Sequence, residues 1–228
     1  MAKFIFITGT DTGVGKTRVA CALIHAARSR GIRVAGFKPV AAGCEQVDGE
    51  WVNEDALALQ QASSSPLPYA AVNPIALPEP IAPHLAATHA GTTIDLKRLD
   101  AAADLLAKTN ELVVVEGAGG WAVPVDDALT VGDWVARRGW PVVLVVGMRL
   151  GCLNHALLSA EAIRRRNPLV GWVANVLPPA MPELAANIES LSQRLPEPLL
   201  GWVGEGVAAE QAAATLDLAA ALKPRAER

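Results

Sequence analysis

The stretch from Lys3 to Thr17, KFIFITGTDTGVGKT, restricts the fold of this chain more than any other. It opens with four apolar residues, Phe4 to Ile7, which are enough for one buried strand. Three glycines among small polar residues follow, and the stretch closes on Gly15-Lys16-Thr17. The next segment, Val19 to Arg28, is typical of a helix. A strand, a glycine-rich loop and a helix in this order are the context in which Gly-Lys-Thr predicts a phosphate site.

The loop has physical features that suit an anion. Glycines allow the backbone to curl until several N–H groups face one point, and the following helix adds the positive end of its dipole. Lys16 is expected to reach the β- and γ-phosphates of a nucleotide, and the Thr17 hydroxyl to bind Mg²⁺. The loop is a variant, because the pattern G-x-x-x-x-G-K-[ST] requires glycine where this chain has Thr10, one residue after Gly9. An ordinary glycine turn between a strand and a helix is the alternative.

Composition narrows the class of protein. A hydrophobic content of 51% with 19% charged residues argues against disorder, and 228 residues can bury the core of one α/β domain spanning 1–228. The net charge is −3 without a basic block, which argues against a nucleic-acid partner. The longest apolar runs, such as Val142 to Val146, are too short to span a bilayer, so no membrane partner is expected.

Compartment and metal content follow from the cysteines and histidines. Three widely spaced cysteines argue against a disulfide framework, and no signal peptide is recognisable, so a reducing cytoplasm is expected. The four histidines have no zinc-type spacing with the cysteines and are expected to be packing or surface residues.

Further along the chain, apolar strands alternate with helices. A Pro-rich excursion, 63–84, is expected to be irregular and to pack on the domain. The expected strands are 33–40, 112–115, 141–146, 170–175 and 199–203, and the expected helices are 53–61, 81–90, 95–109, 129–138, 150–166, 182–195 and 207–222. Continuous apolar strands between helices imply a three-layer α/β fold with a mostly parallel sheet covered on both faces.

Four features outside the glycine-rich loop are candidates for the chemistry of the site. Glu116 closes a strand before a run of glycines and is a candidate Mg²⁺ residue, or else a solvated carboxylate. Lys38 ends another strand, where ligands bind in open α/β sheets, and could neutralise a phosphate; a surface lysine is the alternative. Asp55 lies in a first helical turn, which the helix dipole alone could explain. The helix start at 149–154 could hold a carboxylate, or could simply be capped by Asn154.

Taken as an ordered set, these motifs resemble those of the dethiobiotin synthetases, a family with the P-loop fold. The resemblance runs from residue 3 to about 201 and rests on the segments GTDTGVGKT, GFKPVAAG, NEDALAL, VVVEGAGG, VVGMRLGCLNHA and GWVAN. It implies a reaction in which one amine of 7,8-diaminononanoate takes up CO₂, and ATP phosphorylates the resulting carbamate. The second amine then closes a cyclic urea, with loss of phosphate.

The resemblance also implies roles for individual residues. Lys16 and Lys38 are the expected catalytic pair, and Thr17, Asp55 and Glu116 are expected around Mg²⁺. Residues expected to bind ATP are Gly13, Val14, Gly15, Lys16, Thr17, Arg18, Asp55, Glu116, Gly117, Ala118, Gly119, Asn175, Val176, Gly204, Glu205 and Gly206. Residues expected to bind the diamine substrate are Thr12, Lys38, Ala42, Arg149, Leu150, Gly151, Cys152 and Asn154. Because this family binds the substrate carboxylate across subunits, a homodimer is implied.

Three positions depart from the family pattern. Ala42 replaces an expected serine, Arg149 an expected lysine, and the stretch 201–206 lacks an expected Pro-Trp near the purine.

Nucleotide-switched partitioning and septum-positioning ATPases share the fold group and are the alternative. They carry a loop lysine where this chain has Asp11, and the tail 207–222 is alanine-rich and acidic rather than basic. Both features favour the synthetase.

Overall fold

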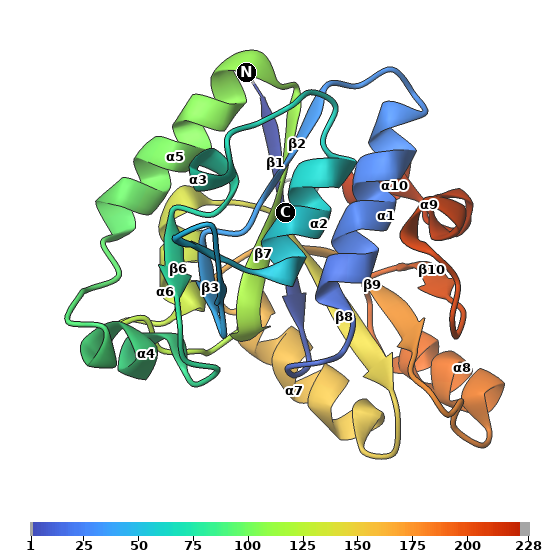
Figure 1. The fold of residues 1–228 in the computed structure, drawn as a ribbon. Helices are drawn as coiled ribbons and strands as arrows, with labels where there is room; N and C mark the ends of the chain where they lie inside the picture. The colour runs from blue at the N-terminus through green and yellow to red at the C-terminus, as the bar shows by residue number, and fades with distance from the viewer. Residues whose placement is uncertain (1, 224–228) are drawn as a thin grey trace.

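The computed structural model describes residues 2–223 as a parallel sheet between two layers of helices (Figure 1). Six strands lie in the order β10-β9-β8-β1-β7-β2, and all neighbours in this sheet are parallel. Their bounds are β1 Lys3–Gly9, β2 Val34–Phe37, β7 Leu112–Gly120, β8 Val142–Met148, β9 Leu169–Val176 and β10 Leu199–Val203. The predicted three-layer, mostly parallel α/β fold is therefore confirmed.

Helices cover both faces because the strands are apolar on both sides. Phe6 belongs to one buried core, while Ile5 and Ile7, which point the other way from the same strand, belong to the second. The first core packs under α4 Pro83–His89, α5 Leu96–Thr109, α6 Val131–Arg138, α7 Cys152–Arg164 and α8 Leu184–Arg194. The second packs under α1 Lys16–Arg28, α2 Glu54–Ala62, α9 Ala209–Ala212 and α10 Leu218–Ala221.

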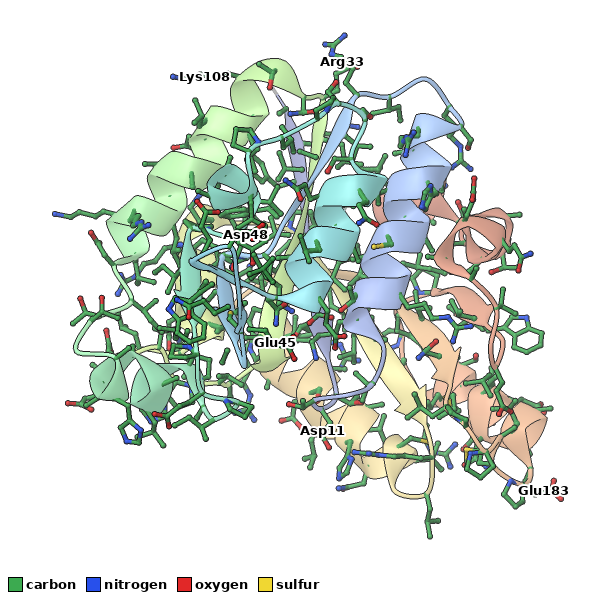
Figure 2. All side chains as sticks on the ribbon, viewed as in Figure 1. Asp11, Arg33, Glu45, Asp48, Lys108 and Glu183 are labelled. Atoms are coloured by element: carbon green, nitrogen blue, oxygen red, sulfur yellow. The ribbon has the colours of Figure 1, made fainter. Side chains whose placement is uncertain are left out.

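All strands of the sheet end at the same edge, and this edge carries the glycine-rich loop. In Figure 2, Asp11 of that loop lies at the opposite end of the molecule from Arg33 and Lys108, which flank the strand beginnings. Among the described residues, no helix combines the length and the apolar character needed to cross a bilayer.

The predicted strand 33–40 is wrong in one respect: it is two strands. β2 ends at Phe37, and β3 (Val40–Ala42) leaves the large sheet to pair in parallel with β6 (Ile75–Leu77). The break falls at Lys38-Pro39, where proline has no N–H to offer a sheet partner. The supposedly irregular stretch 63–84 therefore supplies a strand, and it also contains a short helix, α3 Tyr69–Val72.

A hairpin between β4 (Glu45–Val47) and β5 (Glu50–Val52) was not predicted. Its turn is Asp48-Gly49, and both residues have positive φ, 51° and 85°. Asp-Gly with two left-handed residues is the turn that two-residue hairpins favour, so the signal was present in the sequence.

The predicted helix 207–222 is also wrong, because the chain forms α9, a 3-10 turn (Ala213–Thr215) and α10 instead. The interruption follows from contacts with β10. The Asp217 N–H donates to Leu200 O at 2.7 Å, and Thr215 Oγ1 donates to Trp202 O at 2.9 Å. Asp217 then caps α10 by accepting from the Ala220 N–H.

Candidate active site

The glycine-rich loop joins β1 to α1 at the carboxyl edge of the sheet. Gly13 and Gly15 have φ of 72° and 86°, a region that residues with a Cβ rarely adopt. Space is also limited at Gly15, since a Cβ there would lie 2.1 Å from Asn175 Nδ2. Asn175 donates to Val14 O at 2.9 Å, so the end of β9 holds the loop in place.

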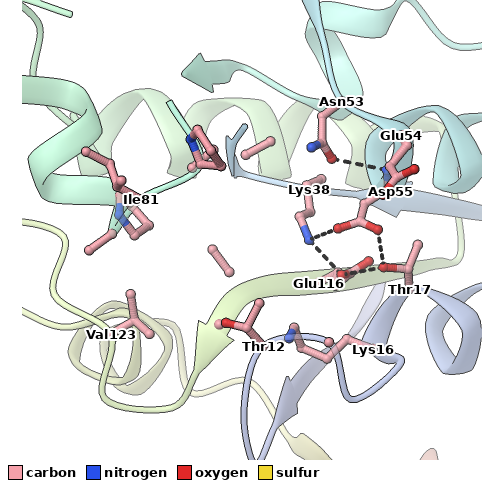
Figure 3. A pocket seen from close by; sticks show the side chains of 18 of the residues that line it. Thr12, Lys16, Thr17, Lys38, Asn53, Glu54, Asp55, Ile81, Glu116 and Val123 are labelled. Carbon is pink, nitrogen blue, oxygen red and sulfur yellow. Dashed lines mark hydrogen bonds and ion pairs between the residues drawn. The ribbon is translucent and has the colours of Figure 1, made fainter. Parts of the chain in front are cut away.

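Lys38 joins two carboxylates at the floor of a cavity (Figure 3). Its Nζ lies 2.6 Å from Glu116 Oε1 and 2.9 Å from Asp55 Oδ2. The side chains of Lys38 and Glu116 are 5% and 0% exposed, so this ion pair is shielded from water. The three groups come from the β2–β3 break, the first turn of α2 and the middle of β7, and only the tertiary fold brings them together.

The charges in this cluster shift one another's pKa values. Burial works to lower the pKa of Lys38, but Glu116 and Asp55 outweigh it and the net direction is upward, so the ammonium stays protonated. Burial raises the pKa of Glu116, and Asp55 adds to this against the opposing effect of Lys38. For the less buried Asp55 the balance reverses: Lys38 overcomes the effect of burial and lowers the pKa. The pKa of Lys16 is lowered by burial and by the Lys38 charge.

The oxygens around Thr17 fit a magnesium ion. Thr17 Oγ1 lies 2.6 Å from Asp55 Oδ1 and 2.9 Å from Glu116 Oε1. A hydroxyl has one proton and can donate to only one of them, so the group has more acceptors than donors. Among residues 2–223, the buried Glu116 Oε2 also finds no hydrogen-bond partner. Adjacent ligands around octahedral Mg²⁺ are about 3.0 Å apart, given metal–oxygen distances near 2.1 Å.

The residues present therefore suit Mg²⁺ held together with phosphate oxygens rather than a closed protein site. Among the described residues, no group of three or more His, Cys, Asp or Glu side chains is arranged so that it could hold a metal ion. Mg²⁺ is commonly held by one or two carboxylates with phosphates and water completing its shell. The phosphates would lie against Lys16 and the start of α1, whose first turn has no acidic residue.

The cavity above this cluster has a volume of about 820 Å³. One side is polar and the other is formed by apolar residues of the segment 80–83 and of the loop after β7, with Ile81 and Val123 facing the cluster in Figure 3. The predicted site residues that line it are Thr12, Gly13, Gly15, Lys16, Thr17, Arg18, Lys38, Ala42, Asp55, Glu116, Ala118 and Gly119. The cavity thus combines a charged end for phosphates with an apolar wall for an aliphatic chain.

Other predicted residues lie outside this cavity. Val14 and Gly117 are buried beneath it, where Phe6 would lie 2.7 Å from a Cβ on Gly117. The remaining residues predicted to bind ATP (Asn175, Val176, Gly204, Glu205 and Gly206) do not line this cavity either. Arg18 contacts this part of the chain, since its Nε donates to Val207 O at 2.7 Å and its Nη2 to Gly204 O.

The segment 149–154 at the start of α7 also does not line the cavity of this single chain. Arg149 pairs with Asp11 of the glycine-rich loop. Cys152 is buried, Gly151 and Asn154 are exposed, and Leu150 is 95% exposed.

Sequence reasoning missed several residues around the cavity. Ile81 and the prolines beside it form its apolar wall, although the stretch 63–84 was expected only to pack on the domain. Val123, which also lines the cavity, received no role from the sequence. The signal was the apolar character of both loops, but their proximity depends on the fold and could not be inferred from spacing.

Comparison with known proteins agrees with this geometry. A family model described as an AAA domain matches residues 3–212. An ATP-dependent dethiobiotin synthetase BioD from Cellvibrio japonicus is 51% identical over 219 residues, covering 95% of this chain and 96% of the relative. The chain belongs to the dethiobiotin synthetase family. A second member, from Pseudomonas paraeruginosa, is 52% identical over 200 residues, which are 87% of this chain and 88% of that one.

Solved structures relate this synthetase family member to other P-loop proteins by fold. The septum site-determining protein MinD from Pyrococcus horikoshii superposes with a TM-score of 0.57 at 15% identity, covering 97% of this chain and 95% of its own. A ParA family ATPase from Chlorobium tepidum gives a TM-score of 0.57 at 14% identity, over 96% and 92% of the two chains. At such identities the likeness concerns the fold alone.

Proposed function

We propose that this protein forms dethiobiotin from 7,8-diaminononanoate, CO₂ and ATP, releasing ADP and phosphate. The observation that carries the proposal is the meeting of Lys16, Lys38, Asp55 and Glu116 at one end of a cavity with an apolar wall. The charged end suits phosphoryl transfer, and the apolar wall suits the alkyl chain of the diamine. Relatives of about 50% identity along the chain carry the same activity in their names.

Each group has a place in this chemistry. A carbamate is a weak anionic nucleophile that must approach an anionic γ-phosphate, and the two buried ammonium groups lower the electrostatic cost of that approach. When bound through Thr17, Asp55 and Glu116, Mg²⁺ would supply further positive charge to the phosphates. After phosphorylation, attack by the second amine is intramolecular, so positioning accounts for much of the ring closure and no side-chain nucleophile is needed.

We further propose that the protein acts in the cytoplasm as a homodimer, with the segment 150–154 contacting the substrate carboxylate across the interface. Leu150, two residues before α7, is 95% exposed, and Leu158 within α7 is 59% exposed. Large apolar side chains exposed at and near the start of α7 support the proposal that a partner subunit covers this surface. A protein that remains monomeric in light scattering at micromolar concentration would contradict this.

The reaction assay is direct. Purified protein receives ATP, Mg²⁺, bicarbonate and the diamine, and ADP and the cyclic urea are both quantified. We expect equal amounts of the two products and no urea from an analogue lacking one amine. ATP turnover that does not need the diamine, or that is stimulated by DNA or lipid vesicles, would contradict the synthetase proposal. It would instead support the alternative of a nucleotide-switched partitioning-type ATPase.

A further inference from the structure

Lys38 stands at a point where the large sheet does not fix its backbone. β2 ends one residue before it, and β3 begins two residues after it. Its peptide groups are held instead by the chain at 72–73. The Lys38 N–H donates to Val72 O at 2.8 Å, and Asn73 Nδ2 donates to Lys38 O at 2.7 Å. Asn73 is 3% exposed, so water does not compete for these bonds.

Tyr69 extends this contact to the helix that carries Asp55. It lies one turn before Asn73 along α3, and its hydroxyl donates to Asn73 Oδ1 at 3.0 Å. The same hydroxyl accepts from the Asn53 N–H at 2.8 Å. Asn53 is the N-cap of α2, and its Oδ1 accepts from the Asp55 N–H at 3.1 Å (Figure 3). One continuous series of hydrogen bonds thus joins the Lys38 carbonyl to the Asp55 amide.

The two helices that this series connects, α2 and α3, belong to no sheet, and the nearest strand pairing is that of β3 with β6, which begins two residues after Lys38 and Asn73. α3 packs against β2, α2 and α5, and it lies outside the six-stranded sheet (Figure 1). We propose that Tyr69 and Asn73 are positioning residues which fix the Lys38 ammonium relative to the Asp55 carboxylate. The proposal rests on the function proposed above, in which Lys38 acts on the reacting groups. Neither Tyr69 nor Asn73 contacts the Thr17 hydroxyl, and neither lines the cavity.

Tyr69→Phe is the decisive variant because it removes one hydroxyl and keeps the ring. It leaves the Asn53 N–H and Asn73 Oδ1 without their partner, so the two ends of the series can move apart. Misplacement of a reacting group by about 1 Å can cost on the order of 100-fold in rate. We expect kcat to fall about 10- to 100-fold, while KM for ATP and Kd for ADP stay within threefold, because the glycine-rich loop is not part of the series.

Asn167→Ala is the matched control. Asn73 Nδ2 donates to two carbonyls, Lys38 O and Ile75 O. Asn167 is likewise buried, at 4% exposure, and its Nδ2 donates to Val135 O and Trp140 O. Its loss should lower the midpoint of thermal unfolding about as much as Asn73→Ala does, yet leave kcat within twofold. If the positioning role is correct, Asn73→Ala follows Tyr69→Phe in losing kcat and not ADP affinity.

A measurement without turnover completes the test. In the ligand-free protein, amide hydrogen exchange at Asn53 and Lys38 should be faster in Tyr69→Phe than in Asn167→Ala. A Tyr69→Phe enzyme with kcat within twofold of the parent, or an equal kcat loss in Asn167→Ala, overturns the positioning role. Absence of diamine-dependent turnover in the parent protein would instead overturn the proposed function, so the two failures are distinguishable.

Discussion

Removal of the Lys38 side chain tests the buried ion pair and the proposed chemistry together. In Lys38→Ala, Glu116 keeps its fully buried position but loses the ammonium that lies 2.6 Å away. Breaking a buried pair by removing one partner costs about 3–5 kcal/mol, because a charge is left in a low-dielectric site. The Lys16 charge still acts on this cluster, so we expect a loss of stability at the lower end of that range, about 3 kcal/mol at pH 8. For comparison, the total free energy of unfolding of a domain is commonly about 5–15 kcal/mol.

This destabilisation should depend on pH in a definite direction. Without Lys38, the pKa of Glu116 rises further above its ordinary value, because burial and Asp55 then act with less opposition. A carboxyl whose pKa is raised on folding contributes its stability in full below the unfolded pKa and loses it as the pH rises through the folded value. The variant should therefore come closest to the parent near pH 5 and differ most from it at pH 8.

Urea unfolding followed by tryptophan fluorescence measures the effect, since Trp121 and Trp172 are buried. Lys97→Ala, which removes an exposed lysine from α5, is the control and should leave the free energy of unfolding unchanged. In Lys38→Ala, kcat should also fall at least about 100-fold, while the affinity for ADP stays within threefold of the parent value. A loss below about 1 kcal/mol at pH 8 would refute the buried-pair reasoning. Near-normal turnover would show that Lys38 takes no part in catalysis.

Three further outcomes are expected. Burial, together with Glu116 and Asp55, raises the pKa of the Cys21 thiol to about 12, so iodoacetamide at pH 8 should label it only after unfolding; rapid labelling of native protein would contradict this. The stabilisation from this neutral thiol should be complete below about pH 9 and decline as the pH rises toward 12, which unfolding curves of Cys21→Ala and parent protein can compare. Gly15→Ala should abolish nucleotide binding in calorimetry, because its Cβ would lie 2.1 Å from Asn175 Nδ2. Gly13→Ala, whose Cβ meets no described atom within 4 Å, should retain weakened binding. Equal losses of affinity in the two variants would refute the steric argument.

Part of the site could be predicted because its residues belong to local patterns. Lys16 and Thr17 follow from the glycine-rich loop, and Lys38 follows from the rule that ligands bind at the carboxyl ends of parallel strands. Glu116 was selected because glycines follow it, although it does not close its strand as expected, since β7 continues to Gly120. Asp55 could not be assigned from its own surroundings, since a first-turn aspartate is equally explained by the helix dipole. Its contact with Lys38 depends on how α2 packs over β2, which only the resemblance to the family suggested.

The misread segments share a physical cause. The tail 207–222 has the composition of a helix, but the Asp217 N–H bonds to Leu200 O of the edge strand β10, which breaks the helix where its own propensity favours continuation. In 63–84 the prolines correctly exclude a long helix, yet one turn suffices to place Tyr69 against Asn73. Local propensity predicts a segment's structure only where partners distant in sequence do not offer its backbone better hydrogen bonds. At β10 and at Lys38 such partners exist, and at Lys38 they hold the residue on which the proposed chemistry depends.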